Sequence, residues 1–445
     1  MDSTPPPSNG KAGTPFVWVP ETLDLDGLIP SEGVRVAEGV LWLGHCVLVG
    51  LAHNARYRDD GRKMPLQATY LRNVIGRHHL DKVREAAERI GYVRRGPSYE
   101  RGKRSQRYWL LEPHATARAV KREITHPGLL RNIRKWREAR QRETWKRIRR
   151  NETPVAAEVC EHLWRHLQRL RIDDEIDFGE DSKPAHQIAV DHIRRREFRF
   201  SVDDFGRVHT NVTNLRKVLR RHLSVDGKRL SNIDTNESQP LFVGLALAKA
   251  AGGRERGKGQ EGQRGRKAGG PTLMLDSVML DKQTALDWKL ERGRLPGDLR
   301  AYLALCEQRG LYLAVADRLG LTGDDGKDPR DEAKKRVFVV FFDKPWHRNR
   351  TYRVLAELFP SVIRSIGEMK GGDHRRLAHF AQRIESAFMY GQVVPRIIRE
   401  RPGLFISTIH DSVLTPVVEE RYVQDVMRSE FAKLGVSPQV KIERC

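Results

Sequence analysis

The stretch LFISTIHDSVLTPVVEE, residues 404–420, places His410 and Asp411 in the middle of an otherwise apolar segment. β-Branched and apolar residues before and after this pair predict two short strands. The histidine and the aspartate then fall at the turn between the strands. The segment therefore predicts a hairpin that carries a carboxylate at its crest.

A second carboxylate is predicted at the end of another strand. In GKRLSNIDTNESQPLFVGLALAK, residues 227–249, a short strand leads to Asp234. Asn236 or Ser238 can then cap a helix that begins near Pro240. Asp234 and Asp411 lie close together if their strands are neighbours in one sheet.

A predicted helix lies between these two stretches in the sequence. DPRDEAKKRVFVVFFDKP, residues 328–345, is bounded by proline at both ends and repeats functional side chains every four residues: Arg330, Lys334, Phe338 and Phe342. These residues stand about 6 Å apart along one helix face. Cations near the positive N-terminal end and rings near the other end suit a nucleoside triphosphate. The alternative is an amphipathic helix with core phenylalanines and solvated cations.

The two carboxylates predict a divalent metal site. Two negative charges about 4 Å apart repel by roughly 4 kcal/mol at an effective dielectric constant near 20. Mg²⁺ accepts carboxylate, carbonyl and phosphate oxygens. Two such ions could activate a 3′-hydroxyl and stabilise departing pyrophosphate, with Mn²⁺ as an alternative ion.

The order of these stretches resembles the family A DNA polymerases and their relatives, the single-subunit phage-type RNA polymerases. Asp234 matches the start of motif A, the residues of the helix correspond to motif B (R-x-x-x-K-x-x-x-F/Y-x-x-x-Y) with Phe342 at its last position, and His410-Asp411-Ser412 matches motif C. Upstream, FGRVHTNVTNLRKVLRRHL resembles the family stretch whose arginine, here Arg207, contacts the primer terminus. The resemblance spans about residues 200–445.

The resemblance implies a role for each site residue. Asp234, Asp411 and the Thr235 carbonyl would bind two Mg²⁺ ions, and His410 would position the primer terminus. Arg330 and Lys334 would hold the triphosphate, and Phe338 and Phe342 would pack near sugar and base. RRLAHFAQRIESAF occupies the place of the template-contacting helix, where Gln382 is either a template contact or a surface polar residue.

Two departures from the family pattern leave the choice of sugar open. The DNA polymerases carry Glu five residues after the motif A Asp and a Tyr at the end of motif B, whereas this chain has Gln239 and Phe342. A bulky Gln239 favours deoxynucleotides, while H-D-S is the RNA polymerase form of motif C. A Ser-His-Asp hydrolase triad is disfavoured, because adjacent strand residues point to opposite faces.

The N-terminal part predicts a separate nucleic-acid-binding domain. Residues 1–29 open with a Pro-, Gly- and Ser-rich run and are expected to be a disordered tail. Residues 30–115 suggest a winged helix-turn-helix, in which two helices precede a hairpin whose wing carries five cations: Arg95, Arg101, Lys103, Arg104 and Arg107. The alternative is a small helical domain with an incidental basic hairpin.

The remaining segments complete an expected α+β, right-hand polymerase architecture. Residues 116–200 predict either a helical thumb that grips a duplex or a plain helical linker. The palm would comprise 201–245 and 373–445, with an antiparallel sheet, and the fingers about 246–372. The Gly/Arg-rich tract 250–271 would be a mobile surface insertion. The chain shows no spaced set of carboxylates for a proofreading exonuclease.

Composition agrees with a nucleic-acid partner. The net charge is +23, and 81 Lys and Arg are spread along 445 residues. Such a field attracts nucleic acid, with an anionic membrane surface as the rival partner. The longest apolar run, about 14 residues, is shorter than the roughly 20 that span a bilayer. Four isolated cysteines favour a reducing, cytoplasmic setting.

The sequence thus favours a monomeric, template-directed DNA polymerase that uses a DNA template, a primer and dNTPs. The winged helix suggests a replication protein of a mobile element, with primer-independent or primase activity and other replication proteins as partners. An RNA polymerase or primase that uses NTPs is the first alternative. A catalytically inactive DNA-binding initiator or regulator is the second.

Overall fold

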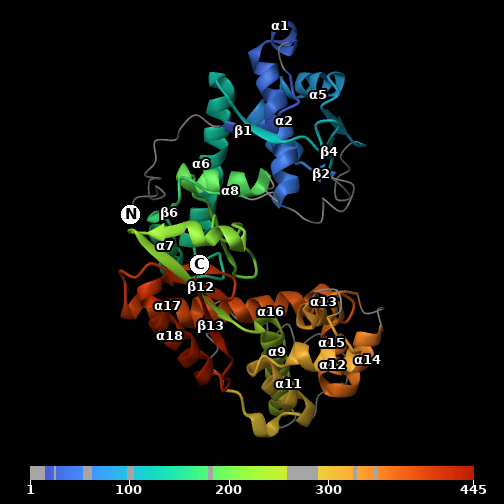
Figure 1. The fold of residues 1–445 in the computed structure, drawn as a ribbon, viewed down its shortest axis with the longest axis vertical. Helices are drawn as coiled ribbons and strands as arrows, with labels where there is room; N and C mark the ends of the chain where they lie inside the picture. The colour runs from blue at the N-terminus through green and yellow to red at the C-terminus, as the bar shows by residue number, and fades with distance from the viewer. Residues whose placement is uncertain are drawn as a thin grey trace. The chain divides into compact units, whose positions relative to one another are not determined.

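The computed structural model describes residues 16–24, 27–53, 63–97, 105–178, 184–257, 289–323, 328–344 and 349–444. The chain divides into two units that each contain helices and antiparallel strands (Figure 1). The first unit comprises residues 1–147, 170–200 and 210–223, and the second comprises 148–169, 201–209 and 224–445. The expected mixture of helix and antiparallel sheet is confirmed.

The first unit is built around a long apolar helix, α2 (Val34–His53), whose Val36, Val40 and Leu43 are buried. By length and composition, residues 34–51 could cross a membrane, but 67% of that window is buried inside the protein. This burial is typical of the core helix of a folded unit. The other elements of the unit are β1 (Phe16–Pro20), α1 (Leu28–Glu32), β2 (Met64–Pro65), α4 (Ala68–Ile75), α5 (Leu80–Arg89), β3 (Val93–Arg95), β4 (Arg107–Leu110), β5 (Ala119–Glu123), α6 (Pro127–Arg149), β6 (Leu170–Ile172), α8 (Pro184–Arg194) and the 3₁₀ turn Lys217–His222; the last two residues of α6 fall in the second unit.

Within this unit, α4 and α5 are followed by a hairpin. Strand β4 pairs with both β2 and β3, so the strand order is β2-β4-β3. Helix α5 follows the predicted apolar spacing, with Leu80, Val83 and Ala87 buried, and the chain turns at Gly91, where φ is 68°. Residues 98–104, which include Arg101, Lys103 and Arg104 of the predicted wing, lie outside the described residues.

The expectation of a disordered tail over residues 1–29 is wrong for its second half. Residues 16–20 form β1, which pairs antiparallel with β5, and Val17 and Val19 are buried. The Pro-, Gly- and Ser-rich composition ends at Pro15 and is followed by FVWV, whose β-branched and aromatic residues favour a strand. Residues 1–15 lie outside the described part of the chain.

The second unit contains an antiparallel sheet whose central strand is β10 (Lys228–Thr235). Strand β10 pairs with β12 (Ser412–Pro416), β13 (Val440–Arg444) and β9 (Leu223–Val225), and β12 also pairs with β11 (Ser407–Ile409). The pairing of β10 with β12 joins residues about 180 positions apart in the sequence. The strands that lead to Asp234 and to Asp411 are therefore neighbours in one sheet, which was the condition for the two acids to lie close together.

Helices make up most of the rest of the second unit. They are α7 (Ala157–Leu167), α9 (Ser238–Gly257), α11 (Gly297–Glu307), α12 (Leu311–Leu319), α13 (Pro329–Phe342), α14 (Arg350–Leu358), α15 (Pro360–Lys370), α16 (Arg375–Phe388), α17 (Val394–Glu400) and α18 (Glu420–Lys433), with the π turn Met389–Val393, the 3₁₀ turns Arg292–Arg294 and Val417–Glu419, and the short strands β7 (Phe200–Val202) and β8 (Val208–Thr210). Helix α7 contacts β11 and α17. Residues 148–169 therefore group with the sheet, although we expected them in one segment with 116–147 and 170–200.

Candidate active site

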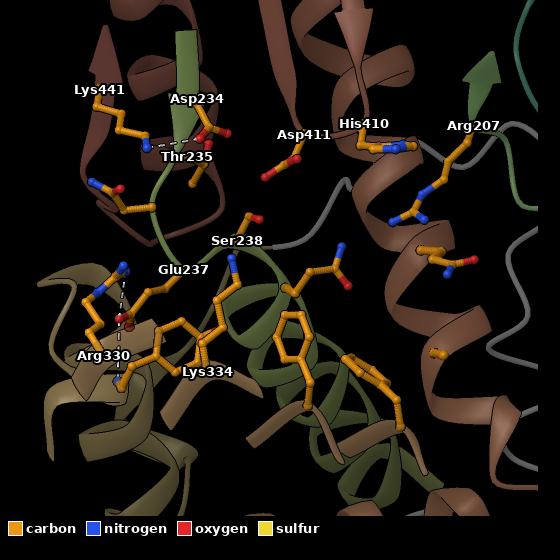
Figure 2. Close-up of a pocket in the computed structure, with 17 residues that line it drawn as sticks. Arg207, Asp234, Thr235, Glu237, Ser238, Arg330, Lys334, His410, Asp411 and Lys441 are labelled. Atoms are coloured by element: carbon orange, nitrogen blue, oxygen red, sulfur yellow. Dashed lines mark hydrogen bonds and ion pairs between the residues drawn. The ribbon is translucent and has the colours of Figure 1, made fainter. Parts of the chain in front are cut away.

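The pairing of β10 with β12 brings Asp234 and Asp411 to the same edge of the sheet. Ile233 is the register partner of Val413 in this antiparallel pair. Asp234 comes directly after Ile233, and Asp411 lies two positions before Val413. Both acids therefore lie where β10 ends and β12 begins. Figure 2 shows the two carboxylates pointing toward a common space from separate strands.

His410 and Asp411 form the two-residue loop of the β11–β12 hairpin, because Ile409 pairs with Ser412. The φ of His410 is 57°, a left-handed conformation that glycine adopts more readily than histidine. Such local strain is tolerated where the surrounding structure fixes it. The Ser412 hydroxyl donates to Asn232 Oδ1 at 2.9 Å and to the Ile409 carbonyl at 3.0 Å. This hydroxyl is buried and engaged, as expected for a residue outside any hydrolase triad.

Electrostatic repulsion acts on Asp234. Burial and the charge of Asp411 raise the pKa of Asp234 to about 6, whereas Lys441 opposes the rise. Lys441 is the register partner of Asp234 on β13, and its Nζ lies 3.4 Å from Asp234 Oδ2 (Figure 2). The same Nζ is 2.5 Å from Glu443 Oε1. The acid pair is thus only partly neutralised by the protein.

Helix α13 presents its four predicted residues to the same cavity. The Asp328 side chain caps its start by accepting from the Arg330 N–H at 2.9 Å, and Pro329 occupies its first turn. The opposite face packs into the core through Ala333, Val337 and Phe341. The alternative in which Phe338 and Phe342 form the core is therefore wrong, because both rings are only half-buried and line the cavity.

Glu237 connects the end of β10 to α12 and α13. Its side chain is fully buried, and its carboxylate accepts from Arg330 Nη2 at 3.3 Å. It also accepts from the Leu311 N–H at 3.1 Å, at the start of α12. The Arg330 guanidinium lies over the Tyr312 ring, 5.3 Å from its centroid. Arg330 Nε is buried and has no hydrogen-bond partner among the described residues.

Arg207 and Gln239 meet at a buried carboxylate, that of Glu385 on α16. Arg207 Nη2 donates to both oxygens of Glu385, at 2.9 and 3.0 Å, and its Nε donates at 3.0 Å. Gln239 Nε2 donates to Glu385 Oε2. Burial and the charge of Asp411 raise the pKa of Glu385 to about 8, while Arg207 opposes this rise.

A tight turn places Arg207 against α16. The N–H groups of Phe205 and Arg207 both donate to Asp203 Oδ1 at 2.9 Å. Gly206 has a φ of 87°, and a Cβ at this position would lie 3.0 Å from Ser386 Cβ. Glycine is therefore required here both for its backbone conformation and for the close approach of the turn to the helix.

These side chains enclose one cavity of about 600 Å³. Its lining includes all of the catalytic, metal and nucleotide residues predicted from the sequence, together with Arg207 and Gln382: Arg207, Asp234, Thr235, Gln239, Arg330, Lys334, Phe338, Phe342, Gln382, His410 and Asp411. The structure brings these residues together; their individual roles stay predictions. Among the predicted wing cations that are described, Arg95 lies in the first unit and pairs with Glu88 at 3.2 Å, and Arg107 lies there on β4.

Sequence reasoning missed three charged residues of this site. Glu237 follows Asp234 by three positions, so an acid next to the predicted strand end was a usable signal. Glu385 lies one helical turn after Gln382 on the same predicted helix, which also could have drawn attention to it. Lys441 carries no local signal, since only the register of β13 against β10 places it beside Asp234.

The carboxylates of this cavity could hold Mg²⁺ if phosphate and water supply the other oxygen ligands. Among the described residues, no group of three or more His, Cys, Asp and Glu side chains is arranged to hold a metal ion. A nucleotide-bound Mg²⁺ needs only one or two carboxylates, with phosphate and water supplying the other oxygens. The mutually repelling pair Asp234 and Asp411 meets that requirement. Thr235 Oγ1 beside them is buried and has no hydrogen-bond partner within the described residues.

No model of a known protein family matches the chain, and no curated protein matches it. Among solved structures, the chain is similar to the POL domain of Pol1 from M. smegmatis in complex with DNA primer-template and dNTP. The sequence identity is 12%, the TM-score is 0.23, and the match covers 92% of this chain but 65% of that one. A TM-score of this size does not establish a common fold.

Proposed function

We propose that this protein is a template-directed nucleotidyltransferase of the family A DNA polymerase type, without proofreading, that adds dNTPs to a 3′-hydroxyl. One observation carries the proposal. A pair of strand-end carboxylates faces a helix that presents two cations and then two aromatic rings across a single cavity. This geometry agrees with the order of the three sequence motifs that resemble the family.

The residues of α13 would bind the incoming nucleotide. Lys334 is exposed toward the cavity and would supply a charge for the triphosphate, while Arg330, which also lines the cavity, is oriented by Glu237. Phe338 and Phe342 would contact the sugar and base. Cations that are fixed before the substrate arrives stabilise developing phosphate charge without reorganisation.

Asp234, Asp411 and the Thr235 carbonyl would hold the divalent cations. Two bound Mg²⁺ ions would supply activation of the 3′-hydroxyl and neutralisation of the leaving pyrophosphate. His410 would position the primer terminus, because it lies in the same hairpin turn as Asp411 and lines the cavity. Arg207 and Gln382 would contact the primer-template duplex from the Glu385 side of the cavity.

The segments would act as palm, fingers and thumb around this site. The sheet that carries Asp234 and Asp411 would be the palm, and α11 to α15 would belong to the fingers. In the first unit, the order helix, strand, helix, helix and hairpin with strand order β2-β4-β3 is compatible with the winged helix-turn-helix predicted from the sequence. A DNA-binding role of the first unit would recruit the enzyme to a duplex, as in a mobile-element replication protein.

A second candidate function, an RNA polymerase or primase, is favoured by one specific observation. Phe342 has no hydroxyl with which to close a sugar gate, and the Gln239 amide is already engaged with Glu385. Because this contact uses the Gln239 Nε2, the Oε1 atom of the same amide would accept from a ribose 2′-hydroxyl.

A primer-extension assay tests the proposal. The wild-type protein, Asp234→Asn and Asp411→Asn are each given a labelled primer-template with dNTPs or with NTPs, and a parallel set omits the primer. Asp425→Asn is the matched control, because Asp425 is an exposed residue of α18 in the same unit. We expect Mg²⁺-dependent incorporation by the wild type and the control, and a loss of 10³-fold or more in both site variants.

The outcomes separate the three candidate functions. Incorporation of dNTPs supports the DNA polymerase. Exclusive use of NTPs replaces it with the RNA polymerase or primase. Absence of incorporation by the wild type with every nucleotide set, in the presence of tight DNA binding, identifies an inactive DNA-binding initiator.

A further inference from the structure

Helix α6 of the first unit carries a concentrated positive charge. Its 23 residues include nine Lys or Arg and only two Glu. Leu129 and Ile133 are buried on one face. At 3.6 residues per turn, four exposed cations fall on the opposite face: Arg131, Arg134, Lys135 and Arg142. We call these four residues the α6 stripe.

The α6 stripe is largely uncompensated. Arg142 pairs with Glu138 at 3.6 Å, but both side chains are more than half exposed, so this pair contributes little. Arg131, Arg134 and Lys135 make no ion pair within the described ranges. They line a hollow of about 480 Å³ together with Leu130 and Glu138. Burial is the main cause that lowers the pKa of Arg35 on α2, and the positive charge of Arg131 lowers this pKa further.

Helix α5 is the second helix of the predicted helix-turn-helix, the one that enters the major groove in such motifs, and its charge is different. Its ten residues contain three cations and three acids, so its net charge is zero. Arg84 pairs with Asp81 at 3.1 Å, and Arg89 pairs with Glu32 of α1 at 2.6 Å. Cations that are already neutralised gain little from a phosphate, because the existing ion pair must first be given up.

We propose that the first unit binds the phosphate backbone of duplex nucleic acid through the α6 stripe, in a sequence-independent manner, and not through α5. From Arg131 to Arg142 the stripe extends about 17 Å, the length of roughly five base pairs. A lipid surface fits less well, since a membrane-binding helix inserts its apolar face. The apolar face of α6 is already buried in the protein core.

The test compares two variants that each remove two positive charges. Arg134→Gln/Lys135→Gln changes the α6 stripe, and Lys82→Gln/Arg89→Gln changes α5. Binding to a fluorescein-labelled 20-base-pair duplex of arbitrary sequence is measured by anisotropy, in EDTA and without nucleotide, between 50 and 300 mM NaCl. Thermal melting checks that each variant is folded, and Arg131→Gln/Arg142→Gln replaces the first variant if it is not.

We expect the α6 variant to bind at least about 10-fold more weakly at 100 mM NaCl, with a log–log salt slope smaller by about 1.8 because two phosphate contacts are lost. The α5 variant should change the affinity by less than about 3-fold. Equal or greater loss in the α5 variant overturns the inference, as does unchanged duplex binding by the α6 variant. Loss of binding to phosphatidylserine/phosphatidylcholine vesicles with retained duplex binding would assign the stripe to lipid.

This inference does not depend on the catalytic proposal. Binding is measured without metal and without nucleotide, so a protein that incorporates no nucleotide could still pass the test. Conversely, an active polymerase whose α6 variant binds duplex normally would refute only the role of the stripe.

Discussion

Replacing Asp234 with asparagine should stabilise the metal-free protein at neutral pH. Asparagine has nearly the same shape but cannot ionise, so it removes both the cost of burying a charge and the repulsion from Asp411. A rise in pKa from 3.8 to about 6 corresponds to about 3 kcal/mol of unfavourable interaction of the charged form. This net shift already includes the opposing effect of Lys441, whose Nζ lies 3.4 Å from Asp234 Oδ2. The expected stabilisation is therefore about 3 kcal/mol.

The stability difference between Asp234→Asn and the wild type should depend on pH in a defined direction. Because the pKa of Asp234 is higher in the folded state than in the unfolded state, ionisation of Asp234 costs stability. That cost is absent below pH 3.8, grows as the pH rises, and is complete above about pH 6. The difference in the free energy of unfolding between the variant and the wild type should therefore increase from pH 4 to pH 6 and stay constant above pH 7.

Urea unfolding in EDTA, followed by circular dichroism at several pH values, measures this difference. Addition of 10 mM Mg²⁺ provides a second comparison, since a ligand that binds the folded state stabilises it. We expect Mg²⁺ to stabilise the wild type and to leave Asp234→Asn unchanged. A variant that is less stable than the wild type at pH 7, or a difference that does not vary between pH 4 and pH 6, would refute the electrostatic reasoning.

Three further predictions concern other parts of the site. Arg207→Gln leaves the Glu385 carboxylate, with 1% of its side chain exposed, without its cation; urea unfolding should show a loss of about 3 kcal/mol, most of which Glu385→Gln in the same chain should restore. His410→Gly should relieve the backbone strain at φ 57° and raise stability by about 1 kcal/mol while lowering primer extension, whereas His410→Ala should lower extension without raising stability. Lys370→Met should cost about 1–2 kcal/mol and raise the KM for nucleotides, because Lys370 Nζ donates at 2.7 and 2.8 Å to two carbonyls at the C-terminal end of α13.

Local patterns were sufficient to predict the parts of the site that short segments determine. The spacing of Arg330 and Phe342 specifies one helix face, and the apolar residues around His410 specify a hairpin. Proline and aspartate at the start of α13 specify where the helix begins. In each case, the determining interactions lie within about fifteen residues of one another.

Contacts between distant segments could not be predicted in the same way. Arg207 and Glu385 are 178 positions apart, and nothing in either segment identifies the other as its partner. Lys441 lies beside Asp234 only because of the register in which β13 pairs with β10. A slip of one residue would turn the Lys441 side chain to the other face of the sheet. The strand at residues 16–20 was missed because the disorder predicted from the Pro-, Gly- and Ser-rich residues 1–15 was extended to residue 29.

The β10–β12 pairing also has a consequence for how the protein matures. Its two acids belong to segments about 180 residues apart, so their encounter needs closure of a very long loop, which is slow compared with formation of any helix or hairpin. A nascent or partly folded molecule therefore has α13 and the His410 turn available long before it has a carboxylate pair. Under the proposed function, the site would become competent only after the long-range pairing of β10 with β12 has formed.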